Sequence, residues 1–483
     1  MNPPNNPSFY LALDQGGHAS RALVFDQSGK IIAQAHQEIE TQYPQCDWVE
    51  HDAEALVTSL QWAMRDVISQ LGKQKNKIIA AGLATQRSSI VSWHRKSGRA
   101  LSAVISWQDR RAADFMQILE KQRTDIHKRT GLFPSAHHGA SKLRWSLLHL
   151  PEVKTAQKAG MLSMGPLASF LSARLTQTER ALTDPANAAR TLLWNIKTGN
   201  WDVSLLKMFD IPLASLPFCV NSTSDFGQIA VSGLKIPLKL VTGDQSAALF
   251  QEGPPRKNAI YINIGTGAFL QKMYKNRPTE TSRLLSSVVF SEKNHRHYAL
   301  EGTVNGAGAA LTWFSKENQI APWPKTAEDW LQKTLTPPIF INGIGGVGSP
   351  FWEPQIKSHF IGKGNTAARF TAVVESILFL IKANLDEMNQ SPETLILSGG
   401  LSASDSLCQK LTNLSEIPIL RSKEQEATAR GLAYLLGKFE VKISDPKSFS
   451  PQPAPKLQSR YLQWLKTMTS GSYQAVKPKE KYK

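Results

Sequence analysis

The first part of the chain alternates short hydrophobic runs with turn residues, a pattern typical of β-strands. Residues 9–14, 22–25 and 30–35 are apolar runs, and an Asp-Gln-Ser-Gly turn joins the last two. Between residues 53 and 71, apolar side chains recur at helical spacing, which predicts an amphipathic helix. Residues 78–83 then form a continuous apolar run, which predicts a buried strand. The chain therefore opens with a three-stranded element, a helix and a further strand.

The second half of the chain repeats this opening pattern. Residues 258–264 predict a strand and residues 268–273 its return strand, with Gly265-Thr266-Gly267 as the tight turn between them. A long amphipathic helix is predicted over residues 370–388, followed by a strand over 393–397 and, after a Gly pair, another helix. Two halves that start in the same way indicate a duplicated α/β architecture.

The length of 483 residues exceeds what one compact core usually accommodates. The repeat places the join near residues 240–244, so we expect an N-terminal domain over residues 1–241 and a C-terminal domain over 242–470. Residues 471–483 form a basic segment that we expect to be a tail without fixed structure.

Three glycine-containing segments follow predicted strands: Asp14-Gln15-Gly16-Gly17, Gly265-Thr266-Gly267 and Ser398-Gly399-Gly400. Glycines allow main-chain N–H groups to approach anionic oxygens, and strand ends lie at the rim of a sheet, where ligands bind. Each turn alone is weak evidence, because hairpins contain glycine for purely steric reasons. Neither the P-loop nor the Gly-x-Gly-x-x-Gly fingerprint is present. The three turns together favour a phosphate site between two α/β domains.

Composition narrows the class of protein further. With 41% hydrophobic and 20% charged residues the chain is expected to be globular, and no apolar run is long enough for a membrane span. The formal charge of +17 comes from scattered basic residues, so we do not expect a nucleic-acid partner. Cys46, Cys219 and Cys408 are widely separated, and the polar, Pro-rich N-terminus is unlike a signal peptide. We therefore expect a cytoplasmic protein.

A series of short segments, in a fixed order from Leu11 to Leu436, resembles the FGGY carbohydrate kinase family. They are Ala12-Leu13-Asp14-Gln15-Gly16, Ser20-Arg21-Ala22, Trp48-Val49-Glu50-His51-Asp52, Gln86-Arg87, Trp107-Gln108-Asp109-Arg110-Arg111, Thr183-Asp184, Asn187-Ala188, Ala189-Arg190-Thr191, Gly243-Asp244-Gln245, Gly265-Thr266-Gly267-Ala268-Phe269, Tyr298-Ala299-Leu300-Glu301-Gly302, Gly399-Gly400 and Ala429-Arg430-Gly431-Leu432-Ala433. The resemblance implies two actin-like, ribonuclease-H-like domains with a cleft between them, and ATP-dependent phosphorylation of a small sugar or polyol.

The resemblance also implies roles for individual residues on the nucleotide side. Asp244 matches the catalytic base, and Asp14 matches the residue that holds Mg²⁺ beside the phosphates of ATP. The remaining nucleotide-side positions match main-chain or side-chain contacts to ATP: Gln15, Gly16, His18, Arg21, Gly265, Thr266, Gly267, Gly399 and Gly400. Arg21 as a surface residue and Thr266 as an ordinary hairpin residue remain open alternatives.

On the acceptor side, the resemblance is greatest to family members that phosphorylate glycerol. It implies that Arg87, Ser88, Trp107, His137, Gln245 and Phe269 surround the acceptor, with Asp244 at the reacting hydroxyl. Trp107 and Phe269 would pack against carbon, although both could instead be core aromatic residues.

Four positions depart from the family pattern. His18 stands where the first loop usually has a small hydroxyl residue, and Ser88 replaces an acidic residue after Arg87. His137 replaces a tyrosine, and Ser398 replaces an aspartate. Loss of one charged hydrogen bond costs about 1.5–3 kcal/mol, so glycerol should bind about ten to a hundred times more weakly.

These departures leave two functional interpretations. The favoured one is a kinase of glycerol or of a related polyol or ketose. The alternative is a catalytically weakened relative that binds a sugar or nucleotide as a sensor. The resemblance also implies a homodimer or homotetramer, although no segment of the sequence specifies an interface.

Overall fold

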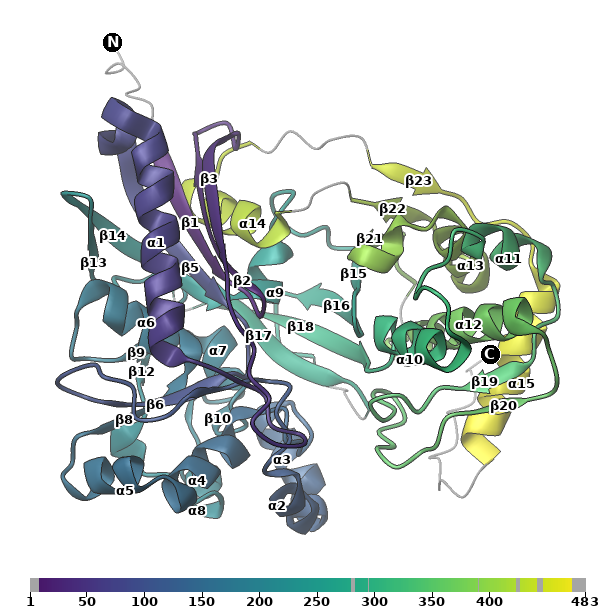
Figure 1. The fold of residues 1–483 in the computed structure, drawn as a ribbon, viewed down its shortest axis with the longest axis horizontal. Helices are drawn as coiled ribbons and strands as arrows, with labels where there is room; N and C mark the ends of the chain where they lie inside the picture. Colours follow the sequence, from purple (N-terminus) through teal and green to yellow (C-terminus); the bar gives the residue numbers. More distant parts are fainter. Residues whose placement is uncertain are drawn as a thin grey trace.

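The structure, a computed structural model, describes residues 8–278, 283–293, 295–389, 391–422, 426–440 and 446–470. These residues form two lobes, each built around a β-sheet covered by helices (Figure 1). The predicted α/β class is therefore confirmed. The predicted basic tail, residues 471–483, lies outside the described residues.

The sheet of the first lobe has six strands in the order β13-β14-β5-β1-β2-β3. Strands β1, β5 and β14 are parallel, whereas β2 and β3 continue the sheet as antiparallel hairpins. The four strands predicted in this region are confirmed. The six strands of this sheet are β1 (Phe9–Gln15), β2 (Ala19–Phe25), β3 (Ile31–Glu38), β5 (Ile78–Thr85), β13 (Gln228–Val231) and β14 (Leu234–Gly243).

The second lobe repeats this arrangement in a seven-stranded sheet of order β17-β18-β16-β15-β21-β22-β23. The hairpin of β15 and β16 is extended on one side by antiparallel β18 and on the other by parallel β21 and β22. The shared strand arrangement matches the duplication that the sequence indicates. The strands are β15 (Ala259–Ile264), β16 (Ala268–Tyr274), β17 (Leu285–Glu292), β18 (His295–Val304), β21 (Thr394–Ser398), β22 (Ile419–Arg421) and β23 (Lys447–Phe449).

The two long predicted helices are present. Helix α1 (Ala53–Leu71) has the predicted bounds, because the Asp52 side chain caps its start and Gly72 ends it with φ near 55°. Its apolar side, including Leu60 and Val67, packs on the first sheet. Helix α12 (Thr366–Glu387) begins four residues before the predicted start, because the Asn365 side chain accepts a hydrogen bond from the N–H of Ala368.

Smaller elements surround the two main sheets. The first lobe carries a four-stranded sheet of order β4-β7-β6-β8 next to helix α4. The remaining elements are β4 (Glu50–His51), β6 (Ile90–His94), β7 (Val104–Ile105), α2 (Ala113–Ile118), α3 (Arg123–Thr130), α4 (Gly139–His149), α5 (Pro151–Lys158), β8 (Leu162–Pro166), α6 (Leu167–Thr176), β9 (Leu182–Thr183), α7 (Pro185–Ala189), β10 (Trp194–Asn195), β11 (Asn200–Trp201), α8 (Val203–Met208), β12 (Phe218–Cys219), α9 (Asp244–Ala248), α10 (Gly308–Asn318), α11 (Ala327–Lys333), β19 (Ile339–Ile341), β20 (His359–Ile361), α13 (Asp405–Ser415), α14 (Ala427–Gly437) and α15 (Pro455–Ser470).

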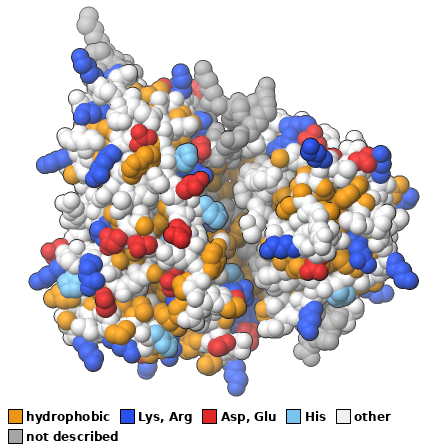
Figure 2. Space-filling model, viewed as in Figure 1, with side chains coloured by type: hydrophobic (Ala, Val, Ile, Leu, Met, Phe, Trp, Pro, Cys, Tyr) orange, Lys and Arg blue, Asp and Glu red, His pale blue; other side chains and the backbone are white. Residues whose placement is uncertain are grey.

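The two lobes share a hydrophobic core at one side of their junction. Phe25 from β2 belongs to the same buried cluster as Phe290 from β17 and Leu432 from α14. Helix α14 follows strand β22 of the second sheet in the chain, yet it packs on β1 and β5 of the first sheet. Away from this core a hollow separates the lobes in the space-filling view (Figure 2). Lys and Arg side chains are dispersed over the face shown there and form no single patch. In the part of the chain described, no helix has the length and apolar character of a membrane span.

Candidate active site

The adjacent parallel strands β1, β5 and β14 of the first sheet end at one edge, where polar residues lie together. In the pairing register, Asp14 of β1 lies beside Ala84 of β5, which lies beside Thr242 of β14. Strand β5 therefore ends next to Asp14. Strand β14 ends next to β5 and leads directly into Asp244, the first residue of α9. Because the carboxyl ends of parallel strands meet at one edge, residues about 230 positions apart in the chain come together.

The two carboxylates at this edge influence each other. Asp14 is 5% exposed, and burial together with the negative charge of Asp244 raises its pKa to about 7. Arg21 of the neighbouring strand β2 partly offsets this, with its Nη1 3.6 Å from Asp14 Oδ2. Burial also raises the pKa of Asp244, although the positive charge of Arg87 opposes that shift. Two carboxylates with raised pKa values at one strand edge are typical of a site that receives a cation.

The seven residues expected to surround the acceptor all line one cavity of about 530 Å³. Arg87, Ser88, Trp107, His137, Asp244, Gln245 and Phe269 are among its wall residues. Trp107 and Phe269 are half-buried, so neither is a fully enclosed core aromatic. The Nδ1 of His137 lies 3.0 Å from the main-chain oxygen of Trp107 and must donate to it. Burial, with Arg110 nearby, lowers the pKa of His137 to about 4, so the ring is neutral and Nε2 is an acceptor.

Arg87 is held across the interface between the lobes. Its Nη1 donates to Glu301 Oε1 of β18 at 3.1 Å, and its Nη2 donates to the side-chain oxygen of Gln245. A side chain at Gly243 would place a Cβ 2.5 Å from Cγ and Cδ of Arg87, so glycine is required there. Glu301 also accepts from Arg190 Nη1 at 2.8 Å. Burial alone would raise the pKa of Glu301, but the two guanidinium groups lower it to about 2.

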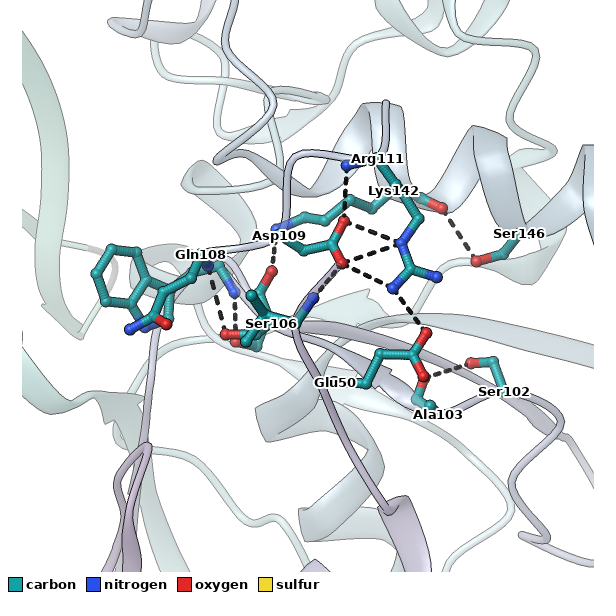
Figure 3. A network of polar contacts seen from close by, with 12 residues as sticks. Glu50, Ser102, Ala103, Ser106, Gln108, Asp109, Arg111, Lys142 and Ser146 are labelled. Carbon is teal, nitrogen blue, oxygen red and sulfur yellow. Dashed lines mark hydrogen bonds and ion pairs between the residues drawn. The ribbon is translucent and has the colours of Figure 1, made fainter. Parts of the chain in front are cut away.

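Lys142 is fully buried and lies in a network of polar contacts beside the acceptor cavity (Figure 3). Lys142 Nζ donates to the main-chain oxygens of Ser88 (2.8 Å), Ser106 (3.0 Å) and His137 (3.0 Å). Ser88 has φ near 66°, a left-handed conformation that is uncommon for a residue with a side chain. Burial lowers the pKa of Lys142 to about 7. One ammonium group thus fixes three segments that carry Ser88, Trp107 and His137.

The same network continues to the charged residues Asp109, Arg111 and Glu50 (Figure 3). Asp109 accepts from the main-chain N–H of Val49 at 2.7 Å and from Arg111 Nη2 at 2.7 Å. Arg111 also pairs with Glu50, at 2.6 Å, and lies over the ring of Trp48. The segments at residues 48–52 and 107–111 that carry the family resemblance are therefore neighbours in space.

A second cavity, of about 660 Å³, lies on the side of the second sheet and is lined by Gly399 and Gly400. Gly399 has φ near 90°, and a Cβ there would lie 2.7 Å from the main-chain oxygen of Ile264. Ser398, the departure from the family aspartate, accepts a hydrogen bond from Asn263 Nδ2 at 3.0 Å. Gln245 and Phe269 line both cavities. The two cavities therefore meet beside Asp244.

Several nucleotide-side residues are not part of the walls of either cavity. Gln15 is fully buried; its side chain accepts from Ser20 Oγ at 2.9 Å, and its main-chain oxygen accepts from the N–H of Gln86 at 3.0 Å. His18 has an exposed side chain in the loop that includes Gly16.

The hairpin turn of the second sheet is likewise outside both cavities. In the turn Gly265-Thr266-Gly267 the Thr266 side chain is exposed. The N–H groups at the start of α10 bond to its carbonyl oxygens, for example Gly308 N to Gly265 O at 2.9 Å. The structure therefore holds this turn in place but does not enclose it.

Sequence reasoning did not single out three residues that organise the site: Lys142, Arg190 and Glu301. Arg190 and Glu301 stand inside segments of the family resemblance, so those segments are the signal that could have indicated them. Lys142 lacks such a signal, because only the tertiary structure shows the carbonyl oxygens around its ammonium group.

Comparison with protein families gives two matches that follow one another along the chain. The model for the FGGY family of carbohydrate kinases, N-terminal domain, matches residues 9–251. The model for the C-terminal domain of the same family matches residues 260–438.

Comparison with individual proteins also finds carbohydrate kinases. The chain is 36% identical to a glycerol kinase of Trichlorobacter lovleyi over 89% of this chain and 90% of that protein. It is 34% identical to a glycerol kinase of Treponema denticola over the same shares. Among solved structures, Plasmodium falciparum glycerol kinase with ADP has a TM-score of 0.86 at 24% identity, covering 97% of this chain and 99% of that one. A gluconate kinase from Lactobacillus acidophilus has a TM-score of 0.83 at 21% identity, over 97% and 99%. The fold is thus the two-domain, actin-like and ribonuclease-H-like fold.

Proposed function

The chain belongs to the FGGY family of carbohydrate kinases, and on that premise we propose that Asp244 directs phosphoryl transfer from ATP to a hydroxyl of glycerol or a related polyol. ATP-dependent phosphorylation of a sugar or polyol alcohol follows from the family and from the glycerol kinase relatives. The observation that carries the assignment to Asp244 is its position on the wall of the acceptor cavity, beside the residues that this cavity shares with the nucleotide-side cavity.

The proposed chemical step transfers one proton and one phosphoryl group. Asp244 accepts the proton of the acceptor hydroxyl, and the hydroxyl oxygen forms a bond to the γ-phosphorus of ATP. The bond from that phosphorus to the bridging oxygen breaks, and ADP leaves with its electron pair. The main-chain N–H of Gln245 donates to Asp244 Oδ1 at 2.7 Å, which orients the carboxylate and favours its ionised form.

The acceptor side supports a small polar substrate with several hydroxyl groups. Arg87 supplies guanidinium donors, and neutral His137 supplies an acceptor, while Trp107 and Phe269 cover carbon atoms and exclude water. Ser88 supplies a hydroxyl where the family has a carboxylate. The cavity volume of about 530 Å³ accommodates a ketose or a longer polyol as well as glycerol.

The nucleotide side supports ATP with magnesium. Oδ1 of Asp14 is buried and accepts no hydrogen bond from any of the residues described, an arrangement that suits a cation or its bound water. Magnesium, when bound with ATP, neutralises charge on the phosphate oxygens. Arg21 adds a guanidinium next to Asp14, and Gly399 and Gly400 allow the nucleoside to approach the main chain.

An ADP-release assay with Mg-ATP over glycerol, longer polyols, ketoses and aldoses tests this function. We expect turnover with at least one polyol, and a loss of at least about a hundredfold in kcat for Asp244→Asn. Affinity for ATP, measured by calorimetry, should stay within about twofold. Asp225→Asn is a matched control: Asp225 is exposed, pairs with Lys239 and lines neither cavity, so this substitution should leave kcat unchanged. Full activity in Asp244→Asn would remove Asp244 from this role.

The departures at His18 and Ser398 motivate the sensor alternative, whereas the retained Asp14, Asp244 and Thr266 oppose it. The same assay separates the two interpretations. ATP binding without turnover on any acceptor of the panel would support a sensor and contradict the kinase.

A further inference from the structure

Gln86 occupies the centre of the strand edge that carries the two site carboxylates. It follows β5 directly, and its main-chain N–H donates to the main-chain oxygen of Gln15 at 3.0 Å. Its predecessor Thr85 pairs in register with Gln15 on one side and with Gly243 on the other. Gln86 therefore stands between the strand end of Asp14 and the strand end of Asp244.

The side chain of Gln86 is buried, and none of the described residues forms a hydrogen bond with it. It is 3% exposed, and neither its Oε1 nor its Nε2 has a partner among the residues that the structure describes. Leaving one buried polar group unsatisfied is unfavourable, and here both ends of one amide are affected. Three neighbouring side chains at the same strand edge also carry a buried oxygen without a partner there: Asp14, Thr85 and Ser246. Such a concentration of unsatisfied groups is typical of a ligand site.

The surroundings of the amide indicate which ligand it meets. Gln86 lines the acceptor cavity together with Asp244. Its Oε1 lies 3.8 Å from the position that a Cβ on Gly17 would take, so the amide also borders the first glycine loop. A group that passes from the nucleotide phosphates to the acceptor must cross this region.

We propose that Gln86 binds the phosphoryl group during its transfer. One end of the amide donates a hydrogen bond to a phosphoryl oxygen, and the other accepts from a water molecule beside it. A neutral amide suits this place, because the carboxyl groups of Asp14 and Asp244 already lie at this strand edge, and a third carboxylate would repel the phosphoryl oxygens. The inference rests on the proposed kinase function and adds a residue that contacts the reacting group.

Replacing Gln86 by methionine tests the proposal, because methionine is also unbranched and flexible but has no amide. We expect kcat to fall about tenfold to a hundredfold, the size of one hydrogen bond to a charged oxygen. Calorimetry should show a fall of similar size in affinity for a non-hydrolysable ATP analogue, with affinity for ADP unchanged. The melting temperature should not fall, since the amide makes no hydrogen bond with any residue that the structure describes. Gln86→Glu should lose more activity than Gln86→Met.

The controls separate this inference from the proposed function. Gln70→Met makes the same chemical change on the exposed surface of α1, away from the site. It should leave kcat, the affinities for ADP and for the ATP analogue, and the melting temperature unchanged. Equal losses of affinity for ADP and for the analogue, or a lowered melting temperature, would show a structural role and overturn the proposal. Unchanged kcat in Gln86→Met would overturn it as well. Absence of turnover in the unsubstituted protein would instead contradict the kinase function.

Discussion

Replacing Glu301 by glutamine should destabilise the protein, because this carboxylate joins the two lobes from a buried position. Glu301 is 3% exposed and lies on β18 of the second lobe. Its oxygens accept from Arg87 (3.1 Å) and Arg190 (2.8 Å) of the first lobe, and from Gln271 (3.0 Å) and Ser287 (2.7 Å) of its own. Glutamine keeps the size of the side chain but removes the charge, and its NH₂ group faces donors.

Two independent estimates give the expected size of the effect. Removing one partner of a buried ion pair costs about 3–5 kcal/mol, since the remaining charges stay buried without compensation. The lowering of the pKa of Glu301 from its ordinary 4.5 to about 2 corresponds to about 3 kcal/mol in favour of the ionised form. We therefore expect a loss of about 3–5 kcal/mol in the free energy of unfolding.

Urea unfolding followed by circular dichroism measures this loss. Glu152→Gln is a matched control: Glu152 pairs with Arg99 at 3.2 Å, but both side chains are about 60% exposed. An exposed pair of this kind contributes at most about 1 kcal/mol. If Glu301→Gln and Glu152→Gln lower the unfolding free energy equally, the buried bridge does not contribute the expected stabilisation of about 3–5 kcal/mol.

The pH dependence gives a second check on the same residue. A carboxyl whose pKa is lower in the folded protein stabilises it above the unfolded pKa, near 4.5, and loses this effect as pH falls toward the folded pKa. The difference in stability between the unsubstituted protein and Glu301→Gln should therefore be constant above about pH 5 and shrink as the pH falls from 4.5 toward 2. A difference that grows in this range would contradict the assigned pKa shift.

Two further substitutions test the nucleotide side and the acceptor side of the site. His18→Thr should maintain or raise ATP affinity in calorimetry, because it restores a small hydroxyl in the first loop; complete loss of binding would show that the imidazole has a function of its own. Lys142→Met should raise the KM for the acceptor by about tenfold or more while the KM for ATP stays constant, because the carbonyl oxygens of Ser88, Ser106 and His137 lose their common donor. Steady-state kinetics with each substrate varied in turn measures the second effect, and equal increases in both KM values would count against a role confined to the acceptor side.

The elements that the sequence predicted well are those whose signals are local. The helix over residues 53–71 has those bounds in the structure, since its apolar spacing, its Asp52 cap and its terminal Gly72 all act within a few residues. The start of α12 was predicted four residues late, because its first four residues bury no side chain in the core and their helical start depends on the cap at Asn365. The acceptor residues could be assigned only through the family resemblance, since no periodicity distinguishes Trp107 or Phe269 from a core aromatic.

By itself, then, the sequence determined the α/β class, the duplicated strand pattern and the family, because hydrophobic spacing and short motifs are written in neighbouring residues. Only the tertiary structure decided which polar groups meet. Arg87 and Glu301 are 214 residues apart and form one buried salt bridge. Lys142 donates to the main-chain oxygen of Ser88, which is 54 residues away in the chain. It also decided that the side-chain amide of Gln86 has no hydrogen-bond partner among the described residues, although the side chain of its neighbour Arg87 has two. Such contacts depend on how sheets and lobes pack, and packing joins residues whose separation along the chain follows no local rule.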